Sequence, residues 1–226
     1  MSRKEEIKAG SEATTKAFDI ELVCNALQTY NENVNALSLD HYLIAYEELR
    51  RFFELLGAVF GFVAKDVDNK IEILKGYRND EQIKSHYETI QSMFDYESSN
   101  NLLKDSKRPS GSRTLLRLHR ALEFIMMFMS ELSKLENNSA TGGVARDCYK
   151  KSLAKYHPWY IQKTASVAMY TLPTRQDLIA RAFGYPPGDE CMTRASEDMA
   201  KLARISECCY NITQKLFEER DLLTLP

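Results

Sequence analysis

Apolar residues recur at intervals of three and four positions along most of the chain, and no segment shows the strict alternation typical of a half-buried β-strand. Because residues three and four apart lie on one face of an α-helix, this pattern predicts an all-α protein. The interruptions are rich in Gly, Pro, Asn and Ser, which commonly break helices. We expect about eight helices, at residues 16–36, 39–76, 80–99, 113–136, 143–155, 159–171, 174–184 and 190–221.

The predicted helices form one continuous unit along the chain. No Pro-, Gly- or Ser-rich linker separates halves of different composition, and no repeat of fixed period is present. We therefore expect a flexible polar tail at residues 1–15 and a single helical domain at residues 16–226.

Composition and charge narrow the classes of function. Hydrophobic residues make up 44% of the 226 residues and charged residues 27%, as in globular proteins with a sizeable core. The net charge of −2 argues against nucleic-acid binding, which usually accompanies a basic excess. The first residues lack the apolar core of a secretory signal, and the longest apolar run, 55–64, is far shorter than the roughly 20 residues of a membrane span. Five cysteines without metal-type spacing predict free thiols, so we expect a cytoplasmic protein with no metal and no cofactor.

One predicted helix combines cationic and apolar residues on a single face. At 100° per residue, Arg113, Arg117 and Arg120 fall within one narrow sector. Phe124 and Phe128 continue this sector toward the C-terminus, while the opposite face is a stripe of Leu, Ile and Met. One wall of the helix therefore changes from cationic to apolar along its length.

An earlier predicted helix repeats this transition, because Asp66 and Lys70 extend one of its apolar stripes. Each pattern alone also fits a purely structural role: an acid–base pair at i,i+4 stabilises a helix surface, and arginines often snorkel along a solvated edge. Two such helices facing each other would instead form a site with an anion-binding mouth and an apolar interior. The apolar members of the earlier stripe are Phe52, Leu55, Val59 and Phe62.

The combination favours an amphiphilic ligand with an anionic headgroup. Converging guanidinium and ammonium groups suit a phosphate better than a carboxylate, because arginine forks bind phosphate oxygens bidentately. Asp66 would then accept hydrogen bonds from a neutral donor beside the phosphate, such as an amide N–H or a hydroxyl. A sphingoid backbone carries both donors, whereas a glycerophospholipid acylated at both positions carries neither at that point.

The segment YHPWY, residues 156–160, contributes a third candidate element. Pro158 prevents helix continuation at His157, so the imidazole lies at a helix break, where it could donate to an amide carbonyl or instead pack in the core. Trp159 and Tyr160 are flanked by lysines, a pattern typical of contact with a membrane interface, although Trp159 could equally be a core residue.

Five blocks carry these residues and their neighbours: FVAKDVDNKI at 62–71, SRTLLRLHRAL at 112–122, YHPW at 156–159, TLPTR at 171–175 and YNITQKLF at 210–217. In this order they resemble the glycolipid transfer protein superfamily and, more narrowly, its ceramide-1-phosphate transfer branch. The resemblance extends from about residue 40 to the C-terminus.

The resemblance implies a two-layer helical sandwich that encloses one lipid and carries it between membranes without catalysis. By motif position, Lys70, Arg113 and Arg117 match the cations that bind the phosphate of ceramide-1-phosphate, and Asp66 and His157 match the pair that holds the ceramide amide. Glycolipid carriers of the superfamily place a tryptophan where this chain has Arg117, so the resemblance implies a phosphorylated cargo rather than a neutral sugar. It also implies a monomer that contacts membranes transiently.

Three other functions fit parts of the sequence. A glycosphingolipid carrier or sensor would share the fold. An enzyme acting on lipid phosphates would need a metal or a general base near the cations, and spacing places no second carboxylate there. A helical scaffold that binds phosphorylated partners would use the arginine sector but would leave its apolar continuation unexplained.

Overall fold

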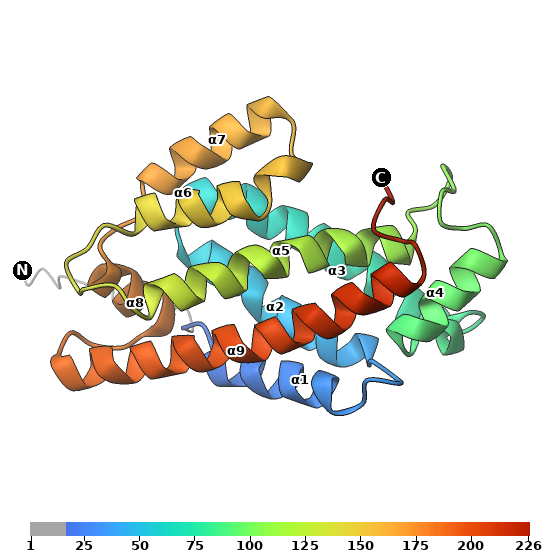
Figure 1. Cartoon of the computed structure of the whole chain (residues 1–226), viewed down its shortest axis with the longest axis horizontal. Helices are drawn as coiled ribbons and strands as arrows, with labels where there is room; N and C mark the ends of the chain where they lie inside the picture. Colours follow the sequence, from blue (N-terminus) through green and yellow to red (C-terminus); the bar gives the residue numbers. More distant parts are fainter. Residues whose placement is uncertain (1–16) are drawn as a thin grey trace, which may run out of the picture.

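The computed structural model describes residues 17–226, and this part of the chain is all-helical, with no strand (Figure 1). The prediction of an all-α fold is therefore confirmed, while the predicted polar tail at 1–15 lies outside the described residues. Short 3₁₀ turns occur at Ala58–Phe60, Lys84–Tyr87 and Ala154–Tyr156. The α-helices are α1 (Ile20–Glu32), α2 (Leu39–Leu55), α3 (Gly61–Asn79), α4 (Ile90–Ser99), α5 (Gly111–Leu132), α6 (Thr141–Lys151), α7 (Trp159–Tyr170), α8 (Arg175–Phe183) and α9 (Asp189–Glu219).

Five helices enclose the apolar core. α5 and α9 lie side by side along most of their lengths, α9 packs on α1, α1 on α2, α2 on α3, and α3 returns to α5 (Figure 1). The outer helices α6 and α7 are attached to this ring through α5, because α6 packs on α5 and α7 packs chiefly on α6. Among residues 17–226, no helix is both long and apolar enough to cross a lipid bilayer.

Aromatic residues from α1 and α2 fill the middle of the ring. Tyr42 and Tyr46 stack with ring centroids 4.9 Å apart, and Tyr30 packs on Tyr42 at 5.4 Å. Burying an unpaired polar group is costly, and the hydroxyls of Tyr30 and Tyr46 are paired, whereas that of Tyr42 has no hydrogen-bond partner in the described part of the chain. Tyr46 donates to the carbonyl of Leu118 on α5, and Tyr30 lies 2.7 Å from the hydroxyl of Thr213 on α9, so these bonds tie α1 and α2 to the helices opposite.

The predicted helix at 39–76 is wrong in one respect, because it is divided into α2 and α3. Gly57 has φ +114°, a conformation that side-chain-bearing residues rarely adopt and that an α-helix cannot contain. The predicted apolar stripe is divided at the same point. Phe52 is buried near the end of α2, whereas Phe62 begins α3 and is 44% exposed. The predicted helix at 80–99 is likewise divided, into a 3₁₀ turn and α4, whose first turn is capped by Thr89.

A buried carboxylate fixes the start of α5. Glu97 of α4 accepts hydrogen bonds from the backbone N–H groups of Gly111 (2.6 Å) and Ser112 (2.9 Å) and from the hydroxyls of Ser110 (2.6 Å) and Tyr87 (2.9 Å). The first N–H groups of a helix lack partners within the helix, and their positive end favours an anion. Glu97 thus sets the position from which the arginine face of α5 begins.

Candidate functional site

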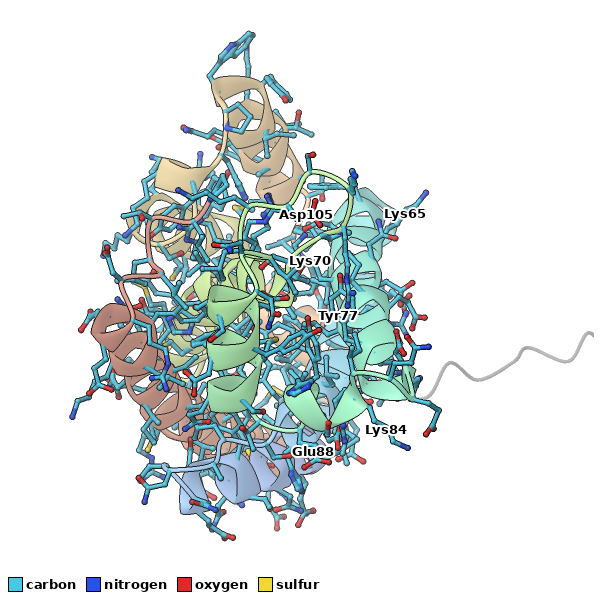
Figure 2. The ribbon with its side chains drawn as sticks, turned by 90° about the vertical axis from the view of Figure 1, so that its right-hand side faces the viewer. Lys65, Lys70, Tyr77, Lys84, Glu88 and Asp105 are labelled. Atoms are coloured by element: carbon cyan, nitrogen blue, oxygen red, sulfur yellow. The ribbon has the colours of Figure 1, made fainter. Side chains whose placement is uncertain are left out.

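The acidic residue of the candidate site lies on α3 beside a lysine. The Lys70 Nζ lies 2.5 Å from Asp66 Oδ1, and the Lys70 side chain is only 13% exposed, whereas that of Asp66 is 67% exposed. In Figure 2, Lys70 lies on α3 on the same side of the molecule as Asp105, which belongs to the loop before α5. Tyr77, two turns further along α3, donates its hydroxyl to the carbonyl of Pro109 in this loop. This bond holds the loop against α3 near the start of the arginine face.

The arginines of α5 bind main-chain oxygens rather than Asp or Glu side chains. Arg113 donates to the Asp105 carbonyl at 3.2 Å. Arg117 donates to the main-chain oxygen of Pro226, the last residue of the chain, at 3.3 Å, and Arg120 donates to the Leu223 carbonyl at 2.9 Å. The described part of the chain places no Asp or Glu side chain within ion-pairing distance of these three guanidinium groups. No acidic side chain therefore balances their positive charge, and an anion would find both charge and donors there.

Arg120 connects this face to the helix break that carries His157. Its guanidinium lies 4.0 Å from the centroid of the Tyr156 ring, the residue immediately before His157. Burial lowers the pKa of Arg120, the Tyr156 hydroxyl raises it, and the neighbouring charge of Arg117 lowers it. Arg120 thus belongs to the same electrostatic cluster as Arg117.

His157 is half-buried and faces the charged pair on α3. Burial lowers its pKa; the Asp66 carboxylate opposes this shift and the Lys70 ammonium adds to it. The imidazole is therefore neutral at pH 7 and can donate one hydrogen bond and accept another. The ring lies against Tyr149, whose hydroxyl is 2.8 Å from His157 Nδ1. The charges of Asp66 and Lys70 thus link α3 to the break before α7, and the contact between Arg120 and Tyr156 links α5 to the same break.

The residues predicted to line an apolar pocket are only partly assembled. Phe124 and Phe128 stack with ring centroids 5.6 Å apart and are buried, and Leu55 is partly buried. Phe52, near the end of α2, packs against Phe18 at 5.3 Å. Phe62 does not join the core, and the side chain of Val59 lies outside the described residues.

Two hollows are present at the surface of the described part, and both lie away from the cations. One, of about 420 Å³, lies between α5, α6 and α9. The other, of about 460 Å³, lies beside residues 17–21, α8 and α9. Neither is lined by Asp66, Lys70, Arg113, Arg117 or His157.

The start of α7 presents large apolar side chains to solvent. Trp159 is 73% exposed, which excludes the core position that the sequence left open, and Tyr160 is exposed beside it. Val167 and Tyr170 extend the exposed face along the helix. Such a patch on a surface helix often marks a site of contact with a protein or a membrane.

Sequence reasoning did not single out several residues that organise this cluster. The oxygens of Leu223 and Pro226 that accept from the arginines belong to the main chain, so no side-chain pattern reports them. Tyr149 lies on α6, separated from His157 by a 3₁₀ turn, and no regular spacing links the two. Arg120 was visible from its place in the arginine sector, although it was not assigned to the phosphate.

The all-helical fold, and the arginine face of α5 that continues into an apolar wall, place this chain in the class of helical lipid carriers. The sequence model of the family described as Glycolipid transfer protein matches residues 37–184, and the chain belongs to this family. The human ceramide-1-phosphate transfer protein is 34% identical over 213 residues, covering 92% of this chain and 97% of that protein.

Solved structures show the same fold. The apo form of the mouse ceramide-1-phosphate transfer protein superposes with a TM-score of 0.83 at 34% identity, covering 92% of this chain and all (100%) of that one. The human ceramide-1-phosphate transfer protein in complex with 2:0 ceramide-1-phosphate superposes with a TM-score of 0.82 at 33% identity, covering 93% and 100%.

Proposed function

We propose that this protein extracts ceramide-1-phosphate from one membrane and delivers it to another without altering it. The observation that carries the proposal is Arg117, an exposed guanidinium on α5 that has no Asp or Glu side chain as a partner in the described part of the chain. A guanidinium at this position offers a planar fork to a phosphate and offers no flat ring on which a sugar could stack. The names of the relatives described above point to the same cargo.

The headgroup contacts follow from the chemistry of the cluster. Lys70, Arg113 and Arg117 would bind the phosphate oxygens, with Arg120 reinforcing the local positive charge. Asp66 would accept hydrogen bonds from the amide N–H and hydroxyl of the sphingoid backbone, while His157 would donate to the amide carbonyl. Lys70 and Asp66 contact each other in the structure. When the lipid binds, each would replace part of this contact with a contact to the lipid.

The apolar chains supply most of the binding free energy. Moving a chain of about 16 carbons into water costs on the order of 10 kcal/mol, at roughly 0.8 kcal/mol per methylene. Enclosing the chains next to Phe124 and Phe128 would remove most of this barrier to exchange. Phe52, Leu55, Val59 and Phe62 remain further candidates for the lining, and Phe62 would have to turn inward to take part.

The exposed start of α7 is the proposed membrane contact. Trp159 and Tyr160 would rest in the interface while Lys155 and Lys163 face anionic headgroups. This arrangement suits a monomer, built on a lipid-binding domain at residues 16–226, that visits membranes from the cytoplasm and is not anchored in them.

Mass spectrometry of lipids extracted from the purified protein tests the proposal, together with transfer of labelled lipids between vesicles. We expect bound ceramide-1-phosphate or a closely related phosphosphingolipid, and transfer that leaves the lipid intact. A bound glycosphingolipid with no phosphorylated lipid would favour the glycolipid carrier instead. Release of inorganic phosphate would show that the protein is an enzyme. If no lipid is extracted from the protein and none is transferred between vesicles, a scaffold that binds phosphorylated proteins would be favoured.

A further inference from the structure

The hydrogen bond between Tyr149 and His157 determines where the imidazole carries its proton. Tyr149 is 3% exposed, and its hydroxyl has His157 Nδ1, at 2.8 Å, as its hydrogen-bond partner in the described part of the chain. If Nδ1 donated to the hydroxyl oxygen, the buried phenol proton would have no acceptor. A buried donor left unpaired is costly, so the arrangement in which Tyr149 donates is favoured.

The protonation states of the two groups support this direction. Burial raises the pKa of Tyr149, so the phenol keeps its proton. Burial lowers the pKa of His157, so the imidazole is neutral and has one nitrogen that can accept. When Nδ1 accepts from Tyr149, the proton of the ring must be on Nε2.

The backbone at His157 is held as firmly as the ring. Gln162 of α7 donates from Nε2 to the carbonyls of His157 (2.8 Å) and Ala154 (2.9 Å), which fixes the break between α6 and α7. His157 Nε2, on the far side of the ring from Tyr149, has no hydrogen-bond partner among residues 17–226. It is a donor oriented by its surroundings and left without an acceptor.

We propose that Tyr149 is a positioning residue that fixes the Nε2–H tautomer of His157, so that this N–H donates to the acyl-amide carbonyl of the cargo. This inference rests on the proposed function for the identity of the acceptor. The opposite tautomer would present a lone pair to the carbonyl oxygen and repel it. Tyr149 therefore contributes selectivity for lipids that carry an acyl carbonyl, without touching the lipid itself.

The proton position can be measured without any cargo. In the apo protein labelled with ¹⁵N-histidine, NMR correlation of the imidazole nitrogens should show the His157 proton on Nε2 and a hydrogen-bonded Nδ1. In Tyr149→Phe, we expect the Nδ1 signal to lose its hydrogen-bond shift and the pKa of His157 to rise, because a donor that stabilised the neutral ring has been removed. A wild-type protein with the proton on Nδ1 would overturn the proposal, and it would do so even if Tyr149→Phe failed to fold.

Binding measurements test the consequence for selectivity. Tyr149→Phe should bind ceramide-1-phosphate roughly two- to tenfold more weakly, the range expected for one hydrogen bond, and should bind sphingosine-1-phosphate, which lacks the acyl carbonyl, as the wild type does. Tyr30→Phe is the matched control, because it removes another buried tyrosine hydroxyl, hydrogen-bonded to Thr213 at a distance from the site. Equal losses for both lipids, or the same loss in the control, would contradict the positioning role. A wild-type protein that binds neither lipid would refute the proposed function while leaving the tautomer result intact.

Discussion

Arg117 is the side chain on which the choice of headgroup depends. Its guanidinium is exposed and donates one long hydrogen bond, to the main-chain oxygen of Pro226, so it contributes little to folding. We expect Arg117→Ala to lower ceramide-1-phosphate transfer between vesicles at least about tenfold, the equivalent of one charge-assisted contact, with urea unfolding unchanged within about 0.5 kcal/mol. The control is Arg204→Ala, which removes an exposed arginine of α9 instead of α5. This variant should transfer ceramide-1-phosphate at the wild-type rate. Wild-type transfer by Arg117→Ala would refute the phosphate assignment.

A second substitution at Arg117 tests whether this position also determines the preference for a neutral sugar headgroup. Arg117→Trp replaces a charged fork with a flat ring on which a neutral sugar can stack. We expect the ratio of glucosylceramide transfer to ceramide-1-phosphate transfer to rise, mainly through loss of the phosphorylated lipid. The ratio is obtained from competition between the two labelled lipids in one vesicle preparation. An unchanged ratio would show that this residue does not set headgroup preference.

His119, between the arginines on the inner side of α5, makes stability depend on pH. The ring is buried, stacks on Tyr210 at 4.3 Å and pairs through Nε2 with Gln214 at 2.8 Å. Burial lowers its pKa from the ordinary value of 6.5 to about 4. Between these values the unfolded chain binds a proton that the native state does not, so stability falls as pH falls.

The expected loss is about 1.4 kcal/mol per pH unit, on the order of 3 kcal/mol in total between pH 6.5 and 4. Urea unfolding at pH 7, 5.5 and 4.5 measures it. The same series with His119→Gln separates this residue from His157, whose lowered pKa acts in the same direction. Parallel pH curves for the two proteins would contradict the assignment.

At the level of the helices, the junction between α4 and α5 holds the arginine face in place. Glu97 is buried and accepts four hydrogen bonds, two of them from the first N–H groups of α5. Glu97→Gln removes the charge and turns an amide NH₂ toward groups that are themselves donors. We expect the free energy of unfolding to fall by about 2 kcal/mol or more, because buried donors lose a charged acceptor.

The control for this junction is Glu81→Gln, which affects an exposed ion pair with Lys84 and should cost less than about 1 kcal/mol. If Glu97→Gln is as stable as this control by urea unfolding, the carboxylate does not fix the start of α5. Ceramide-1-phosphate binding should weaken together with stability in Glu97→Gln, because Arg113 lies in the turn that the carboxylate anchors.

At the scale of the whole molecule, the sequence predicted what depends on local periodicity. The helical spacing of apolar residues predicted an all-α fold, and the spacing of Arg113 and Arg117 placed both on one face of one helix. The break at Gly57 could not be predicted from periodicity, because the apolar run on both sides of it has the pattern of one buried helix. As a result, Phe52 and Phe62 were wrongly placed on a single buried stripe.

Local sequence patterns did not predict which segments, far apart in the sequence, contact each other in the fold. The backbone acceptors of the arginines come from the loop at Asp105 and from the C-terminal segment, and backbone carbonyls leave no signature in side-chain spacing. The pairing of Tyr149 with His157 depends on how the chain turns between α6 and α7. Such contacts are set by tertiary packing, which sequence periodicity does not report.

Phe124 and Phe128, the proposed wall of the lipid site, are buried and stacked on each other. Protein interiors are close-packed, so an acyl chain that lies against these rings requires neighbouring side chains or helices to move. α7 is the element best suited to yield, because it packs chiefly on α6 and buries only Ala165, Ala168 and Met169. Regions with few buried apolar contacts open at low cost in free energy.

We therefore expect amide hydrogen exchange in apo protein to be faster in α7 than in α5 or α9, and binding of short-chain ceramide-1-phosphate to slow exchange in α7 and α3. α1, which packs on α2 and α9 away from the cations, is the internal control and should show little change. Amides of α7 exchange from conformations in which this helix has opened. A lipid that binds only when α7 is closed lowers the population of the open conformations, so exchange becomes slower. If saturating lipid slows exchange only in α1, or leaves α7 unaffected while binding tightly, the chains enter by another route and α7 is not the moving part.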